Sequence, residues 1–100
     1  MYSDLQKAFE AYSLKIVPRA QDLNMDGDRL IDIRSSEEVK SDPSDLTVTH
    51  IAFEELAAKP ENFIERELHY WLICSSGKRS KALCDHLQKL GYRLSPCRLY

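Results

Sequence analysis

Residues 70–90 read YWLICSSGKRSKALCDHLQKL, and this stretch decides how the rest of the chain is organised. Its apolar run Tyr70–Ile73 predicts a buried strand, and residues 81–90 have the apolar spacing of an amphipathic helix. Between them stand Cys74 and a short polar loop that contains a glycine. A strand, a turn and a helix N-terminus in this order aim free backbone N–H groups at the cysteine sulfur. We therefore expect Cys74 to be a reactive thiol.

The loop itself has the composition of an anion site. Its backbone N–H groups can curl around the sulfur, and Gly77 permits the positive φ that such a curl needs. Lys78 and Arg79 can hold an incoming oxyanion, Arg79 through two parallel hydrogen bonds. A base next to Cys74 is not needed if the thiolate is already formed. The residues expected around the sulfur and its ligand are Ser75, Ser76, Gly77, Lys78, Arg79 and Ser80.

Length and composition restrict the class of protein. One hundred residues, 43% of them hydrophobic, predict a single globular domain. Apolar runs stay far below the ~20 residues of a membrane span, and the N-terminus does not resemble a signal peptide, so we expect no membrane association. Three cysteines have neither the pattern of a disulfide framework nor the spacing of a zinc site. We therefore expect no metal and a reducing, cytoplasmic location.

The charge is small but unevenly distributed. A net charge of −2 argues against a nucleic-acid partner. Residues 1–60 hold 7 basic and 12 acidic side chains, whereas residues 61–100 hold 7 basic and 4 acidic. Three of the later bases, Lys78, Arg79 and Lys81, lie close to Cys74 in the sequence. We expect a positive mouth there, suited to a small anion or an acidic partner surface.

The other segments alternate between the patterns of helices and strands. Helical segments are expected at 3–12, 19–24, 35–38, 53–59 and 63–67, and strands at 14–17, 29–34, 47–51, 70–73 and 93–100, the last with Pro96 near its beginning. A turn is expected at 26–28, and Gly91 is a stop signal for the helix before it. This order predicts an α/β three-layer domain with a mainly parallel, about five-stranded sheet flanked by helices. Ligands of such sheets bind beyond the carboxyl ends of strands, where Cys74 and Arg34 both fall.

Several motifs carry a family resemblance. Residues 30–34 read LIDIR, residues 49–56 read THIAFEEL, residues 74–80 read CSSGKRS, and the helix end at 90–92 reads LGY. In this order and spacing they resemble the strand, middle segment, active loop and helix end of rhodanese-like domains. The resemblance implies a rhodanese-like domain over residues 14–100, preceded by an N-terminal helical extension over residues 1–13.

The resemblance implies a sulfurtransferase. Cys74 would take sulfane sulfur from thiosulfate or a protein persulfide, carry it as a persulfide without any cofactor, and pass it to a thiophilic acceptor. Backbone amides of residues 75–80 would hold the persulfide, Lys78 and Arg79 would orient the donor, and Arg34 would support the loop or the entrance. The implied macromolecular partner is a sulfur-carrier or persulfide-donor protein, and we expect a monomer.

The sequence also departs from the family. Residues 44–49 replace the usual Gly-His-Ile-Pro-Gly-Ala, and His50 aligns with an Asn of the family, so it receives no inherited role. The chain stops at Tyr100, before the family's usual Gly-Gly and closing aromatic helix. The expectation is a more open active site, or a fragment related to the terminal modules of enzymes that adenylate ubiquitin-like sulfur carriers.

Two other kinds of phosphate-binding loop fit these residues less well. A cysteine phosphatase has five residues between Cys and Arg, and here Arg79 comes one position too early. A P-loop needs Gly where Leu72 stands and Ser or Thr where Arg79 stands. A non-catalytic rhodanese-like interaction or regulatory module remains the alternative to an enzyme.

The remaining polar and sulfur side chains are expected to be structural. Cys84 and Cys97 are expected in the core, with a resolving thiol as the alternative for Cys97. The three histidines are expected at the surface or hydrogen-bonded. The acidic cluster is expected to be a solvated loop or a partner-binding edge; it consists of Glu37, Glu38, Asp42 and Asp45.

Overall fold

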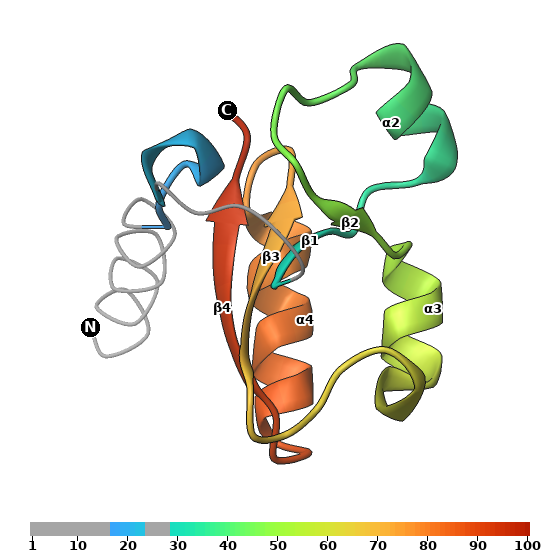
Figure 1. Ribbon diagram of the computed structural model, residues 1–100, viewed down its shortest axis with the longest axis vertical. Coiled ribbons are helices and arrows are strands. Elements are labelled where there is room, and N and C mark those ends of the chain that lie inside the picture. Colours follow the sequence, from blue (N-terminus) through green and yellow to red (C-terminus); the bar gives the residue numbers. More distant parts are fainter. Residues whose placement is uncertain (1–16, 24–28) are drawn as a thin grey trace, which may run out of the picture.

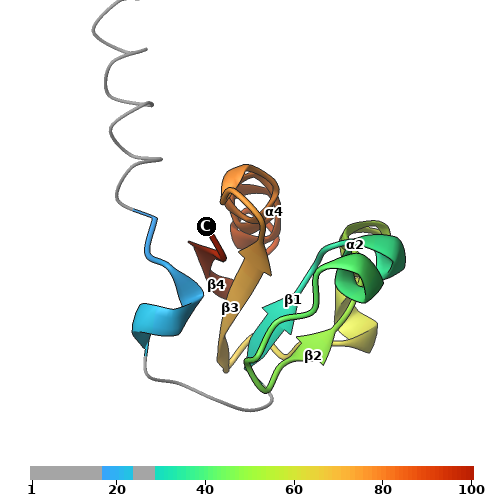
Figure 2. The ribbon, with the colours of Figure 1, turned by 90° about the horizontal axis from the view of Figure 1, so that it is seen from above.

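The computed structural model describes residues 17–23 and 29–100 of the chain. In them, one parallel sheet has the strand order β2-β1-β3-β4. Helices α3 and α4 cover one face of the sheet, and the 3-10 helix η1 lies on the other (Figure 1), as the view from above also shows (Figure 2). The bounds are η1 Ala20–Leu23, β1 Leu30–Asp32, α2 Ser36–Ser41, β2 Thr49–His50, α3 Phe53–Ala58, η2 Pro60–Asn62, β3 His69–Cys74, α4 Lys78–Gln88 and β4 Arg93–Arg98. The predicted α/β three-layer class is confirmed.

Strand β3 is the centre of this architecture. It pairs with β1 through Leu72 opposite Ile31, and with β4 through Leu72 opposite Pro96. A central strand of a parallel sheet is buried on both faces, which explains its unbroken apolar run. Because successive side chains point to opposite faces, Leu72 and Cys74 pack toward α4, whereas Ile73 packs toward η1.

Two apolar clusters hold the layers together. The larger one joins the sheet to α3 and α4, where Leu56, Leu83 and Leu87 are fully buried. The smaller one lies on the other face and includes Ala20 of η1 and Cys97 of β4. Both faces of the sheet are therefore covered, and the carboxyl ends of the strands are left as the edge on which polar loops gather.

The described sheet has four strands where the sequence predicts about five. Of the first predicted strand, residues 14–16 lie outside the described residues, and Val17 is not in a strand. The chain then runs beside β4 only briefly, with a single bridge between Arg19 and Arg98. Pro18 accepts a hydrogen bond from the Arg98 N–H but has no N–H to give in return. The helix expected at 3–12 and the turn at 26–28 also lie outside the described residues.

Several predicted boundaries are wrong. Strands β1 and β2 are shorter than the expected 29–34 and 47–51, and three further differences concern α4, Pro96 and η2. Helix α4 begins at Lys78, three residues before the expected start, because Gly77 caps it directly after the turn. Pro96 lies in the middle of β4, which is tolerated because β4 is at the edge of the described sheet. The helical turn expected at 63–67 is not formed; a 3-10 helix, η2, lies just before these residues and begins at Pro60.

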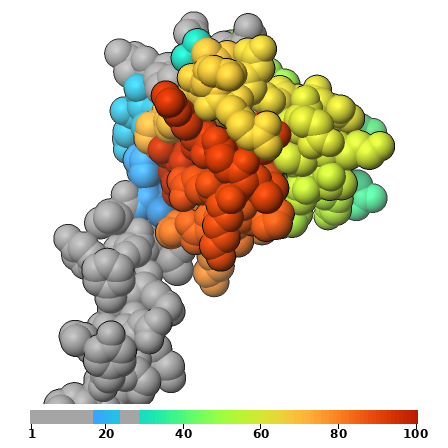
Figure 3. Space-filling view, turned by 90° about the horizontal axis from the view of Figure 1, so that it is seen from below, coloured from blue at the N-terminus to red at the C-terminus, as the bar shows by residue number. Residues whose placement is uncertain are grey.

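The end of the molecule away from the carboxyl ends of the strands is held by Arg66. Its Nε donates to the Leu90 carbonyl at 3.2 Å, and its guanidinium lies 4.5 Å from the centre of the Tyr92 ring. Gly91 turns the chain between these two partners with a φ of +96°. In Figure 3 the segment around residues 60–68, in yellow, packs against orange atoms of α4 and redder atoms of the chain that follows it. In residues 17–23 and 29–100, no helix has the length and apolar character needed to cross a bilayer.

Leu72→Ala tests the central position of β3. Leu72 is fully buried between the layers. We expect the free energy of unfolding in urea to fall by about 2–5 kcal/mol, because the truncation leaves a cavity. The matched control is Leu90→Ala, since Leu90 is 46% exposed, and it should change that free energy by no more than about 0.5 kcal/mol. Equal losses in the two variants would contradict this assignment of the core.

Candidate active site

Cys74 is the last residue of β3, and its side chain is fully buried. The chain after β4 fixes the start of the loop from the other side. Leu99 N–H donates to the Cys74 carbonyl at 3.0 Å, and Tyr100 N–H donates to the Ser75 carbonyl at 3.1 Å. The sulfur is therefore held at the carboxyl end of the central strand, where parallel sheets bind ligands.

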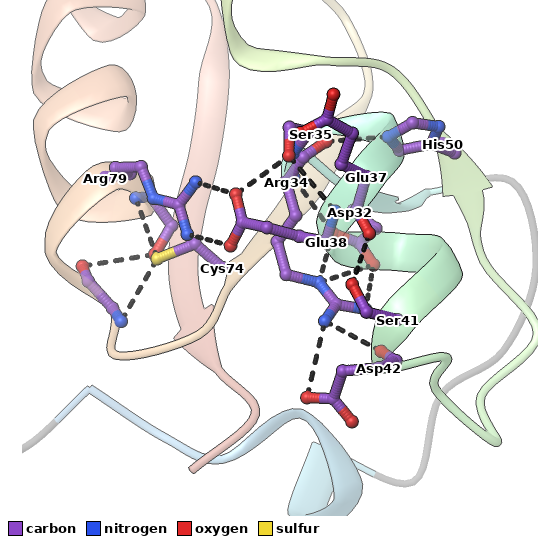
Figure 4. A network of polar contacts seen from close by, with 12 residues as sticks. Asp32, Arg34, Ser35, Glu37, Glu38, Ser41, Asp42, His50, Cys74 and Arg79 are labelled. Carbon is purple, nitrogen blue, oxygen red and sulfur yellow. Dashed lines mark hydrogen bonds and ion pairs between the residues drawn. The ribbon is translucent and has the colours of Figure 1, made fainter.

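The sulfur accepts two backbone hydrogen bonds. Gly77 N lies 3.1 Å from Cys74 Sγ and Ser80 N lies 3.3 Å from it (Figure 4). Gly77 has a φ of +90°, the left-handed conformation that directs its N–H back to the sulfur at the start of α4. Of the amides expected to surround the sulfur, these two make the contact. They can stabilise negative charge on Cys74 and on an atom attached to it.

Ser80 connects the sulfur to β4. Its hydroxyl lies 3.4 Å from Cys74 Sγ, 2.9 Å from the Cys97 carbonyl and 3.1 Å from the Gly77 carbonyl. A single hydroxyl proton serves one acceptor at a time, so when it goes to a carbonyl the oxygen is free to accept the thiol proton. After the thiol loses its proton, the hydroxyl can turn and donate to the sulfur. Ser80, fully buried, thus fits either protonation state of Cys74.

Arg79 forms an ion pair with a residue that sequence reasoning did not place in the site. Its Nη1 and Nη2 lie 2.7 and 2.8 Å from the two carboxylate oxygens of Glu38 (Figure 4). These hydrogen bonds lower the pKa of Glu38 to about 2, with help from the Ser35 N–H. The hydrogen bonds to Glu38 likewise raise the pKa of Arg79. Glu38 and Arg79 are therefore both charged, and their ion pair links α2 to α4 beside the loop.

The sequence did contain a signal for Glu38. Ser35 and Glu38 have the spacing of a capping box, and the structure forms both of its hydrogen bonds at the start of α2, each at 3.2 Å. That pattern predicts the helix start, but not that the same carboxylate reaches a side chain 41 positions later. Glu38 is therefore held in an ion pair, which the acidic cluster did not suggest.

The predicted positive mouth is largely neutralised. Arg79 is paired with Glu38, and Lys81 is paired with Asp85 one helical turn further along α4, at 2.8 Å. Lys78 is exposed at the first position of that helix, and Ser76 is exposed in the turn before it. Of the three bases expected to form a positive mouth, two are therefore paired with acidic side chains of α2 and α4.

Arg34 is fully buried and supports the rim of the site. Its guanidinium binds the Asp32 carboxylate, with Nη2 2.9 Å from Oδ2, and donates to the Asp42 carbonyl at 2.9 Å (Figure 4). The bond to Asp32 raises the pKa of Arg34. His50 Nε2 lies 2.7 Å from the Arg34 carbonyl, which can only accept, so this nitrogen carries the proton. Arg34 thus anchors the chain at the end of α2.

The other two cysteines lie in the core, and of the two remaining histidines His69 is hydrogen-bonded and His86 is exposed on α4. Burial raises the pKa of Cys84 and of Cys97 to about 12, so both are core thiols. His69 binds the Ser95 hydroxyl at 2.8 Å, and burial lowers the pKa of its ring. In the part of the chain that the structure describes, no three His, Cys, Asp or Glu side chains converge as metal ligands would.

Comparison with known proteins supports the fold alone. No family model and no curated protein matches the chain. The structure is similar to the crystal structure of SSP1007 from Staphylococcus saprophyticus subsp. saprophyticus, with a TM-score of 0.63 and 18% sequence identity. The similarity covers 78% of this chain and 76% of that one.

Gly77→Ala tests the geometry of the loop. The new side chain would need a φ of +90°, and its Cβ would lie 3.2 Å from Val17 Cγ1. We expect a loss of about 1–3 kcal/mol in unfolding free energy and an altered alkylation rate of Cys74, because the Gly77 N–H must shift. The control is Gly91→Ala, which imposes similar strain at a φ of +96° far from the sulfur. An unchanged Cys74 rate in Gly77→Ala would mean that the amide does not govern the sulfur.

The ion pair between Glu38 and Arg79 predicts a pH dependence of stability. The pKa of Glu38 falls from 4.5 to about 2 on folding, so the pair stabilises the fold above pH 4.5 and this contribution is lost as the pH falls toward 2. Both side chains are more than a third exposed, which limits the contribution to about 1 kcal/mol or less. The unfolding free energies of wild type and Glu38→Gln should therefore differ above pH 4.5 and converge near pH 2. The same convergence is expected for Arg79→Ala. A difference that stays constant with pH would contradict the pairing.

Proposed function

We propose that this chain is a rhodanese-like sulfurtransferase that moves sulfane sulfur through a persulfide on Cys74. One observation carries the proposal: the Cys74 sulfur accepts the N–H groups of Gly77 and Ser80 at the start of an eleven-residue helix. Such amides stabilise a thiolate and, one atom further out, the terminal sulfur of a persulfide anion. The motifs at residues 30–34, 74–80 and 90–92 resemble the same family.

The reaction needs no cofactor. The Cys74 thiolate attacks the outer sulfur of thiosulfate and forms a new S–S bond. The original S–S bond of thiosulfate breaks, its electron pair leaves with sulfite, and a persulfide anion remains on Cys74. A thiolate acceptor then attacks the terminal sulfur of the persulfide and returns Cys74 to the thiolate. With a protein persulfide as donor, the leaving group is that protein's thiolate.

The charged residues have separate roles in this proposal. Lys78, exposed at the start of α4, attracts an anionic donor, and Arg79 orients the oxygens of that donor once its guanidinium is free. Arg34 keeps the chain around Asp42 in place at the rim. Three free thiols suit the reducing conditions of the cytoplasm, where a persulfide can form and be passed on.

Mass spectrometry tests the proposal directly. After incubation with thiosulfate and removal of excess donor, the intact protein should gain the mass of one sulfur atom, and reduction should reverse the gain. Cys74→Ala should abolish the gain. Cys84→Ala is the matched control and should retain the gain, because Cys84 is a core thiol in the same buried cluster as Cys74. No gain with thiosulfate, and none with a low-molecular-weight persulfide, would refute the sulfurtransferase proposal.

The second candidate is a non-catalytic interaction module. It is favoured by the complete burial of Cys74 and by the pairing of Arg79 with Glu38, which together leave the sulfur closed. A module would use the loop as a docking surface without forming a persulfide. The same mass measurement separates the two functions, since the mass of a non-catalytic module does not change after incubation with any sulfur donor.

A further inference from the structure

The ion pair between Arg79 and Glu38 lies beside the loop that encloses the Cys74 sulfur. Arg79 is the second residue of α4 and directly precedes Ser80, whose N–H binds Cys74 Sγ. Glu38 reaches it from α2, on the other side of the loop (Figure 4). Cys74 itself has no exposed surface. With Lys78, these two side chains are the charged groups next to the loop that holds the sulfur.

The pair is built so that it can exchange partners. Arg79 is 41% exposed and Glu38 37%, so water reaches both groups and weakens their attraction. Helix α2 has no buried residue, and moving the Glu38 side chain away therefore disrupts no core packing. By contrast, the pair of Arg34 with Asp32 is fully buried and cannot open without exposing the interior.

The geometry of the pair matches that of an anionic sulfur donor. Glu38 offers two oxygens from one carbon to two guanidinium nitrogens, at 2.7 and 2.8 Å. A donor such as thiosulfate has terminal oxygens on one sulfur and can present two of them to the same nitrogens. A donor bound in this way would use the same guanidinium nitrogens as the Glu38 carboxylate.

We propose that Glu38 is a specificity-determining residue, an internal competitor that occupies Arg79 in the resting protein and that an anionic donor must displace to reach Cys74. The proposal rests on the sulfurtransferase function only for the identity of the anion. Glu38 thereby keeps small anions off the reactive sulfur at low concentration and makes turnover depend on donors that bind Arg79 more strongly than a carboxylate does.

Alkylation of Cys74 tests this proposal without requiring sulfur transfer. Iodoacetate is anionic and iodoacetamide is neutral, and the two have the same reacting carbon. The ratio of their rates at Cys74, followed by peptide mass mapping, reports how an anion is received at the mouth. Glu38→Gln removes the charge of the competitor while a Gln at this position can still complete the capping box of α2.

The expected result is a change in the rate ratio rather than in stability. In Glu38→Gln, the ratio of iodoacetate to iodoacetamide should rise about five- to tenfold, the size of one close charge interaction near a surface. Glu37→Gln is the matched control, because it removes the same charge from the position directly before Glu38 in α2. Glu37 takes part in none of the ion pairs in the described ranges. Its ratio should stay close to wild type.

A double-variant comparison shows whether Glu38 acts through Arg79. In an Arg79→Ala background, Glu38→Gln should no longer change the ratio. With thiosulfate, Glu38→Gln should lower KM several-fold more than it changes kcat. A purely structural role would alter both alkylation rates equally and leave their ratio unchanged.

Three outcomes would overturn the proposal. The first is an iodoacetate-to-iodoacetamide rate ratio that does not change in Glu38→Gln. The second is a rise in that ratio that Glu38→Gln still causes in the Arg79→Ala background. The third is that neither reagent alkylates Cys74 in any variant. The failure of the sulfurtransferase proposal has a different signature. In that case the ratio responds to Glu38 as expected, but no variant gains sulfur from thiosulfate.

Discussion

Strand β3 hydrogen-bonds to β1 on one side and to β4 on the other, and this double pairing places Cys74. Because the strand is buried on both faces, its register cannot shift by one residue without moving Cys74 from one face of the sheet to the other. The sulfur therefore lies on the face of the sheet that α4 covers, where the N–H groups of Gly77 and Ser80 can reach it. The turn with a left-handed glycine, the start of α4 and the return of the chain at Leu99 all depend on that position.

Two arginine–carboxylate pairs then arrange the rim around the sulfur, and they differ in exposure. The pair of Arg34 with Asp32 is buried, so removing either partner would leave an uncompensated charge in the interior. It ties the end of β1 to the chain after α2 through the Asp42 carbonyl. The pair of Arg79 with Glu38 is half-exposed and holds α2 to α4 only through hydrogen bonds that water and other anions can replace. One pair gives the rim its shape, and the other can respond to a ligand.

The strength of each sequence signal explains which predictions succeeded. The apolar run of β3 and the apolar centre of β1 predicted their strands, because burial on both faces leaves little choice of residue. The burial of Cys84 follows from the apolar face that it shares with Leu83 and Leu87 on α4, and the burial of Cys97 from the apolar character of a free cysteine. The start of α4 was placed three residues late, because Lys78, Arg79 and Ser80 suggest a polar loop while their backbone already forms the first helical turn. Pro96 is expected near the beginning of its strand, because the sequence does not show that this strand lies at the edge of the described sheet, where a proline is tolerated in the middle.

The sequence by itself determined the parallel α/β class, the position of Cys74 between a strand and a helix, and the glycine that turns the chain back to the sulfur. These features are local, since they depend on apolar spacing and on backbone angles within about ten residues. Only the tertiary structure decided the electrostatics of the site. Glu38 and Arg79 are 41 positions apart, and their side chains meet because the fold brings the start of α4 and the Glu38 side chain of α2 to the carboxyl ends of the strands. The charge of the loop, read along the chain, is positive; in the folded protein it is largely balanced, because a carboxylate from another helix lies within hydrogen-bond distance.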